Sequence, residues 1–152
     1  MCCRGGVSWR GMTTASLERI RNSFELLAPR IASMTVTFYD TLFEGRPEVR
    51  ALFKVDMDIQ RQHLAAALAL IVRNLAMLDA LQEPLQQLGR DHARVGVRPE
   101  HYPMVRDAML HAIGEAIGPA WTAELAADWH SLLEELSAVM LSGTLPKLPR
   151  RD

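Results

Sequence analysis

The stretch LQEPLQQLGRDHARVGVRPEHY, residues Leu81 to Tyr102, decides the fold because it directs one histidine out of an apolar helical face. Spacings of four, three and four residues place four side chains on one stripe of a predicted helix: Leu81, Leu85, Leu88 and His92. Gly96 and Pro99 predict that this helix ends soon after His92. A neutral imidazole on an apolar wall suits the iron of a buried porphyrin, but it is also typical of a core histidine bonded to a backbone carbonyl. This stretch alone leaves both interpretations open.

Composition and charge exclude several classes of protein. The chain has 152 residues, of which 49% are hydrophobic, and a formal net charge of −1. This length suffices for one domain with a buried core. The balanced charge gives no electrostatic footprint for nucleic acid or an anionic membrane. The longest apolar stretch, Leu64 to Val72, is too short to span a bilayer. We therefore expect neither nucleic acid nor a membrane as a partner.

The two ends of the chain differ from its middle. Cys2 and Cys3 are adjacent and terminal, so they can form neither a disulfide framework nor a four-ligand zinc site, which favours a reducing, cytoplasmic setting. The N-terminal residues lack the apolar core of a signal peptide, and Met12 begins a stretch typical of a natural start. We expect residues 1–15 to form a disordered leader, residues 16–141 the folded domain, and residues 142–152 an irregular tail.

Helical periodicity runs through the middle of the chain, and no segment alternates with the period of a strand. About seven helices are expected, with no internal repeat, and together they form a single all-α domain. They are a helix capped by Ser16, one beginning at Pro29, a short one at Pro47, a long one from about Ile59 to Leu78, the helix of His92, one opened by Tyr102 and Pro103, and one capped by Thr122. Length and pattern alone leave a helical bundle and a globin-like packing both open.

Two motifs and a tryptophan carry a resemblance to a known family. The run TFYDTLFEGRPEVRALF (Thr37 to Phe53), the run LGRDHARVGVRPEHYP (Leu88 to Pro103) and Trp129 resemble bacterial single-domain globins, relatives of the haem domain of flavohaemoglobins. The stretch DMDIQRQHLAAALALIVRNL is similar to the Hell's Gate type of single-domain globin. The resemblance covers most of the chain, from about Leu17 to Met140. It implies a globin fold around a haem b pocket.

The resemblance also implies roles for single residues. His92 matches the proximal iron ligand, and Phe53 matches the phenylalanine that packs flat against the porphyrin. Tyr39 and Gln60 match the distal tyrosine and glutamine, and Leu64 matches the apolar residue that roofs the ligand site. Tyr39, Phe53 and Leu64 could also be plain core residues, and Gln60 an ordinary first-turn residue. The expected haem-binding set is completed by Leu88, Val97, Tyr102, Val105 and His63.

His63 and Tyr102 qualify this assignment. A longer loop after Phe53 would place His63 at the distal position, whereas the favoured register places it at the pocket edge, toward a haem propionate or solvent. A less favoured alternative is that His63 serves as a sixth iron ligand when no gas is bound. In flavohaemoglobins a glutamate on the last helix completes a relay with the tyrosine at the Tyr102 position, and Thr144 stands at that position here. This departure argues against peroxidase-like chemistry and strong dioxygenase activity.

These residues imply reversible binding of dioxygen, nitric oxide or carbon monoxide at a five-coordinate haem iron, for oxygen capture or storage or for nitric oxide detoxification. The sequence has no G-x-G-x-x-G fingerprint, so turnover as a nitric oxide dioxygenase would need a separate flavin or NAD(P)H reductase. Two alternatives stay open: a haem-based gas or redox sensor that signals to a partner, and a haem-free helical bundle. The sequence predicts no oligomeric state.

Overall fold

The computed structural model describes Trp9 and residues 12–146, and this part of the chain folds into α- and 3₁₀-helices without strands. Most of the expected leader and tail lies outside the described residues. The elements are α1 (Thr14–Leu27), η1 (Ala28–Arg30), α2 (Ile31–Gly45), η2 (Pro47–Leu52), α3 (Met57–Arg73), η3 (Leu75–Leu81), α4 (Gln82–Arg94), α5 (His101–Ile117), η4 (Gly118–Ala120) and α6 (Ala123–Ser142). The all-α prediction is confirmed, with six α-helices in the described part.

Several helix ends follow from local chemistry. Thr122 caps α6 because its hydroxyl accepts from the backbone N–H of Leu125 at 3.1 Å, as predicted. The predicted cap at Ser16 is wrong. Thr13 caps α1 instead, because its hydroxyl accepts from the N–H of Ser16 at 3.1 Å. The end of α4 at Arg94 confirms the predicted stop after His92.

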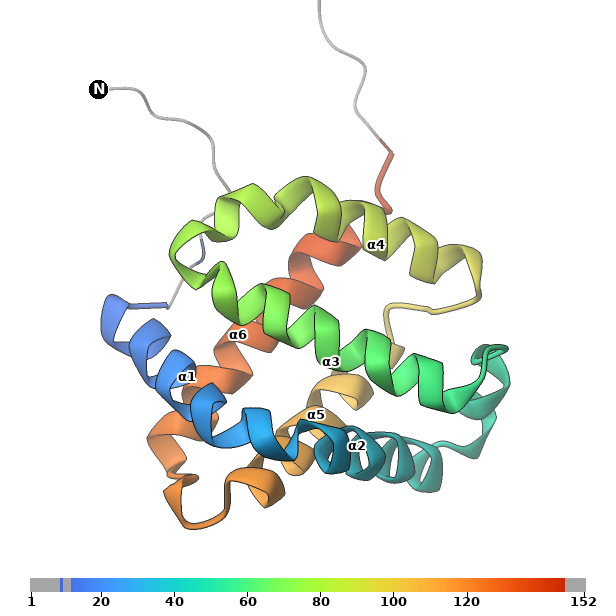
Figure 1. Cartoon of the computed structure of the whole chain (residues 1–152). Coiled ribbons are helices and arrows are strands. Elements are labelled where there is room, and N and C mark those ends of the chain that lie inside the picture. The colour runs from blue at the N-terminus through green and yellow to red at the C-terminus, as the bar shows by residue number, and fades with distance from the viewer. Residues whose placement is uncertain (1–8, 10–11, 147–152) are drawn as a thin grey trace, which may run out of the picture.

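The long helix predicted to reach Leu78 ends five residues earlier, at Arg73. The side-chain amide of Asn74 donates to the carbonyl of Leu70 at 2.7 Å, and Met77 has a non-helical backbone with φ −136° and ψ 42°. The chain then turns sharply, and the axes of α3 and of the stretch Leu75–Arg94 differ by 111°. This turn brings α4 back across the molecule above α3 (Figure 1).

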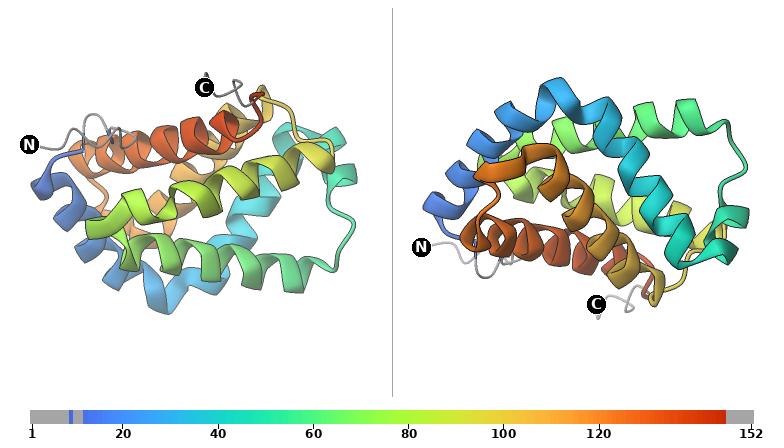
Figure 2. Two further views of the ribbon diagram at one scale, coloured as in Figure 1. Left: turned by 90° about the horizontal axis from the view of Figure 1, so that it is seen from above. Right: turned by 90° about the horizontal axis from the view of Figure 1, so that it is seen from below.

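The helices pack in two layers. In Figure 1, α3 and α4 lie in front and α5 and α6 behind them, and the views from above and below in Figure 2 agree. The most extensive helix contacts are those of α2 with α5 and of α4 with α6. Helix α4, which follows the bend, is therefore held by a helix distant in sequence, α6. No single helix of the described residues is long and apolar enough to cross a membrane.

The deepest part of the core joins α1 to α6. Trp129 is fully buried, and its indole N–H donates to the hydroxyl of Ser23 at 3.0 Å. That hydroxyl donates onward to the carbonyl of Ile20 at 2.7 Å, so the buried polar atoms of this pair are satisfied. Nearer the surface, Arg19 contacts Asp128 at 2.6 Å and lowers the pKa of that carboxyl. These contacts anchor α6, against which α4 packs.

Replacement of Ser23 tests this anchor. Ser23→Ala leaves the indole N–H of Trp129 buried without a partner, so we expect a loss of about 1–3 kcal/mol in the free energy of unfolding, measured by denaturant titration. Ser33→Ala is the matched control, because the exposed hydroxyl of Ser33 makes the same type of bond to the carbonyl three residues earlier. The control should change stability by less than about 0.5 kcal/mol. Equal losses in the two variants would contradict this role of Ser23.

Candidate functional site

His92 lies in the last turn of α4, with its ring held by the backbone of its own helix. Its Nδ1 lies 2.8 Å from the carbonyl oxygen of Leu88. Because a carbonyl can only accept, Nδ1 carries the hydrogen of this bond, and in the neutral imidazole Nε2 then keeps a free lone pair. This neutral tautomer is the form of histidine that binds a metal through Nε2.

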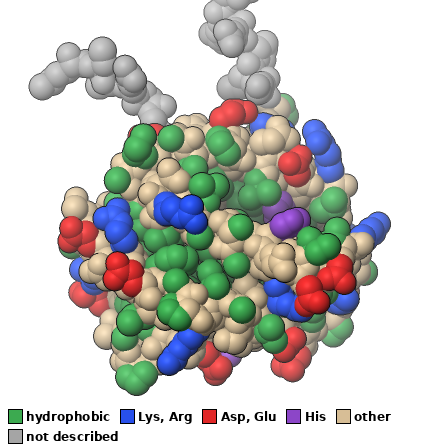
Figure 3. Space-filling view, viewed as in Figure 1, with side chains coloured by type: hydrophobic (Ala, Val, Ile, Leu, Met, Phe, Trp, Pro, Cys, Tyr) green, Lys and Arg blue, Asp and Glu red, His purple; other side chains and the backbone are tan. Residues whose placement is uncertain are grey.

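Some apolar side chains of α4 and α5 are more exposed than a closed core would leave them. Leu88 stands on the same helical stripe as the buried Leu85 and is 39% exposed, and Val105 on α5 is 36% exposed. Figure 3 shows the face over α3 and α4 hollowed, with hydrophobic and histidine side chains around the hollow. Exposed apolar side chains on the helix of His92, together with its imidazole, are the surroundings that a haem requires. The residues present therefore fit this group.

Tyr39 is the buried polar group on the other side of the predicted site. It lies on α2 and is 4% exposed. The side-chain amide of Gln60, from the first turn of α3, donates to its phenolic oxygen at 3.1 Å. Burial raises the pKa of Tyr39, while Gln60 and the nearby Arg61 lower it less. The phenol therefore stays protonated at neutral pH, and its own O–H is free to donate.

Aromatic rings fix the position of Tyr39. Phe38 and Phe53 approach it edge-on, with ring centroids 4.8 Å and 5.5 Å away, and Phe43 lies at 5.8 Å. Phe43 also contacts Phe53 at 5.4 Å and lies under the guanidinium of Arg50. Such edge-to-face packing restricts the rotation of each ring. The cluster therefore holds the Tyr39 hydroxyl in one place.

The remaining predicted residues are distributed around these two groups. Leu64 and Val97 are half-buried, and the N–H of Val97 donates to the carbonyl of His92 at 3.0 Å in the turn after α4. His63 is exposed on α3. Tyr102 is half-buried, and burial raises its pKa. Among the described residues no hydrogen bond joins His92 to the Tyr39 group.

Thr144 forms no relay with the proximal group. It follows the end of α6, is exposed, and donates its hydroxyl to the carbonyl of Leu141 at 2.7 Å. Within the described part of the chain, His92 Nδ1–H donates to the carbonyl of Leu88 alone. The backbone therefore takes the place that a carboxylate relay holds in flavohaemoglobins.

Two functional details escaped the sequence reasoning. Gln60 donates to Tyr39, and a sequence has no signal for such a bond between two helices. Gly89, three residues before His92, allows α4 to approach α6 very closely. A glycine inside a helix can indicate a close contact with another element, because glycine otherwise destabilises the helix.

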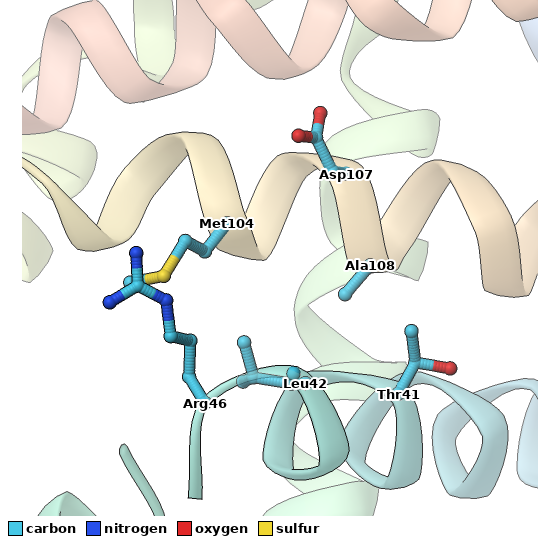
Figure 4. Close-up of a pocket in the computed structure, with 7 residues that line it drawn as sticks. Thr41, Leu42, Arg46, Met104, Asp107 and Ala108 are labelled. Atoms are coloured by element: carbon cyan, nitrogen blue, oxygen red, sulfur yellow. The ribbon is translucent and has the colours of Figure 1, made fainter. Parts of the chain in front are cut away.

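A second, shallow hollow of ≈ 290 Å³ lies between α2 and α5 (Figure 4). Its floor is formed by the buried Leu42 and Ala108, and its rim by Thr41, Arg46 and Asp107. None of these residues belongs to the predicted haem-binding set. This hollow is therefore separate from the His92 site.

Comparison with known proteins assigns the family. The family model described as Globin matches residues 36–140. The chain belongs to the globin family. A flavohemoprotein of Bacillus subtilis is 30% identical over 117 residues, which cover 75% of this globin and 29% of that protein. An uncharacterized globin-like protein of Aquifex aeolicus is 26% identical over 131 residues, covering 86% of this chain and 93% of its own.

Two solved structures are similar in fold. An engineered carbene transferase from Rhodothermus marinus, provisionally assigned as a nitric oxide dioxygenase, superposes with a TM-score of 0.78 at 30% identity, covering 86% of this globin and 92% of that chain. A bacterial globin from Campylobacter jejuni superposes with a TM-score of 0.76 at 23% identity, covering 86% and 95% of the two chains. Membership of the family implies a haem cofactor.

The raised pKa values of the two tyrosines give a testable pH dependence. In the folded globin the phenols of Tyr39 and Tyr102 should ionise only above about pH 10, the ordinary value, whereas in the unfolded chain they ionise near it. Their contribution to stability is thus complete below about pH 10 and is lost as the pH rises further. Ultraviolet titration of phenolate checks this, and Tyr39→Phe should remove one of the two delayed steps. A Tyr39 step at or below about pH 10 would contradict the burial.

Proposed function

We propose that this globin holds haem b through Nε2 of His92 and binds dioxygen, nitric oxide or carbon monoxide on the side of Tyr39 and Gln60. The observation that carries the proposal is the bond from His92 Nδ1–H to the carbonyl of Leu88, because in the neutral imidazole it leaves the lone pair of Nε2 free to bind iron. A haem iron held by one such imidazole supplies an open coordination position for a diatomic gas. Leu64, Leu88 and Val105 provide the apolar surroundings.

Tyr39 is the main hydrogen-bond donor to a bound gas in this proposal. Its phenol is buried and protonated, and the amide of Gln60 already donates to its oxygen. Gln60 therefore orients the phenol and polarises its O–H, since hydrogen bonds in a chain strengthen one another. A donor to a partly charged acceptor contributes about 1.5–3 kcal/mol, which slows release by roughly one to two orders of magnitude.

Slow release suits oxygen capture, storage or chemistry with nitric oxide better than rapid delivery. The similarity to a flavohemoprotein and to a protein provisionally assigned as a nitric oxide dioxygenase supports the chemistry with nitric oxide. The chain spans only 29% of the flavohemoprotein. For nitric oxide detoxification, we propose a flavin- or NAD(P)H-dependent reductase as the electron donor. We favour a cytoplasmic setting, where such reductants are available.

Tyr39→Phe tests the donor role. The variant keeps the ring and its aromatic contacts but loses the O–H, so dioxygen dissociation, measured by stopped flow with carbon monoxide displacement, should become about tenfold faster or more. Gln60→Leu should accelerate release less, because it removes the partner of the donor and leaves the donor itself. Trp121→Phe, an aromatic change beside Gly114 and away from the site, should leave the rate unchanged.

The order of the three rates is diagnostic. An unchanged rate in Tyr39→Phe would contradict the role of its hydroxyl. A larger effect in Gln60→Leu than in Tyr39→Phe would show instead that the amide donates directly to the gas. Loss of haem from the wild-type protein during purification and reconstitution would overturn the proposed function as a whole.

A further inference from the structure

Gly89 lies at the closest approach of α4 to α6. A Cβ atom placed on Gly89 would stand 1.9 Å from the carbonyl oxygen of Met140 and 2.5 Å from its carbonyl carbon. Both atoms belong to the backbone of α6, so no side-chain rotation could relieve the clash. Any larger residue at this position must push the two helices apart.

The approach is reciprocal. A Cβ atom on Gly143, just after α6, would stand 2.3 Å from the carbonyl oxygen of Gln86 on α4. Gly89 follows Gln86 by three residues, and Gly143 follows Met140 by three, so the two segments run in opposite directions. One turn of α4 therefore rests directly on the last turn of α6, backbone against backbone.

Polar contacts reinforce this crossing on both sides. The amide of Gln86 donates to the hydroxyl of Ser142 at 3.1 Å, and the guanidinium of Arg90 donates to the carbonyl of Gly143 at 3.3 Å. The same guanidinium contacts Glu83 at 3.1 Å. These bonds restrain α4 against sliding along α6. The two glycines determine how closely the helices approach at the crossing.

The crossing is connected to His92 by a single peptide group. The carbonyl that accepts from Nδ1 of His92 belongs to Leu88, and its carbon is bonded to the nitrogen of Gly89. A displacement of Gly89 would therefore move the acceptor of the imidazole N–H as well as the helix that carries the ring. The direction and basicity of Nε2 both depend on that hydrogen bond.

From this arrangement we infer that Gly89 and Gly143 are positioning residues for His92. Their contact sets the height and orientation of the imidazole through the Leu88–Gly89 peptide, and it replaces a carboxylate relay as the support of the proximal ligand. The inference rests on the proposed haem ligation by His92. It assigns a role to the α4–α6 contact beyond stability.

Resonance Raman spectroscopy of the reduced, gas-free holoprotein tests the inference through the iron–histidine stretching band. Gly89→Ala and Gly143→Ala should both shift this band, and each should accelerate haem loss by about tenfold or more, the usual effect of disturbing the support of a metal ligand. Gly45→Ala is the matched control, because a Cβ there meets nothing within 4 Å. Its band and rate should equal those of the wild type.

A second background separates positioning from general destabilisation. In His92→Gly supplied with free imidazole, the ligand is no longer tethered to α4, so adding Gly89→Ala should leave the iron–imidazole band unchanged. An equal shift in both backgrounds, or no shift in the tethered one, would contradict the inference. If Gly89→Ala does not fold, Gly143→Ala decides in the same way. Absence of an iron–histidine band from the wild type would instead overturn the proposed function.

Discussion

The hydrogen bond of 2.8 Å between Nδ1 of His92 and the carbonyl of Leu88 is the interaction on which the site depends. In the neutral imidazole this bond fixes the tautomer and leaves the lone pair of Nε2 free. A backbone carbonyl is a weaker acceptor than a carboxylate, so it makes the imidazole less electron-donating than a glutamate relay would. This difference favours gas binding over chemistry that breaks an oxygen–oxygen bond.

The fold supports this interaction from two directions. The α4–α6 contact at Gly89 holds the helix of His92, and the fully buried Trp129 anchors α6 to α1. The opposite side of the site is built separately, by α2 and α3, where Gln60 donates to Tyr39. The imidazole of His92 is held by a bond within α4, and the phenol of Tyr39 is held by a bond from α3. Each side is therefore in place before a ligand binds.

How much could be predicted from the sequence depended on the range of the interaction. The cap at Thr122 and the helix end after His92 follow from local chemistry, and the structure confirms both. The break at Asn74 was missed, because a side-chain bond to Leu70 and the sharp turn that follows override an otherwise continuous apolar pattern. Gly89 was also missed, since its meaning depends on a helix some fifty residues later.

The site residues also divide into those that local sequence patterns predict and those that depend on contacts between distant helices. The helical stripe predicted that His92 would project from an apolar wall, and the family resemblance identified Tyr39 and Gln60 as a pair. The direction of the bond between Tyr39 and Gln60 could not be read from the chain, because it depends on the relative placement of α2 and α3. The exposure of Leu88, one turn before His92, is likewise a property of the assembled helices.

Absorption spectroscopy of the haem-reconstituted protein tests the central claim most directly. Spectra are recorded in the ferric state, after reduction with dithionite, and after addition of carbon monoxide. Ligation by His92 with an open position opposite predicts a five-coordinate reduced spectrum whose Soret band sharpens and shifts with carbon monoxide. A reduced spectrum that is already six-coordinate would contradict the open position and point to His63, and the absence of a Soret band would contradict haem binding.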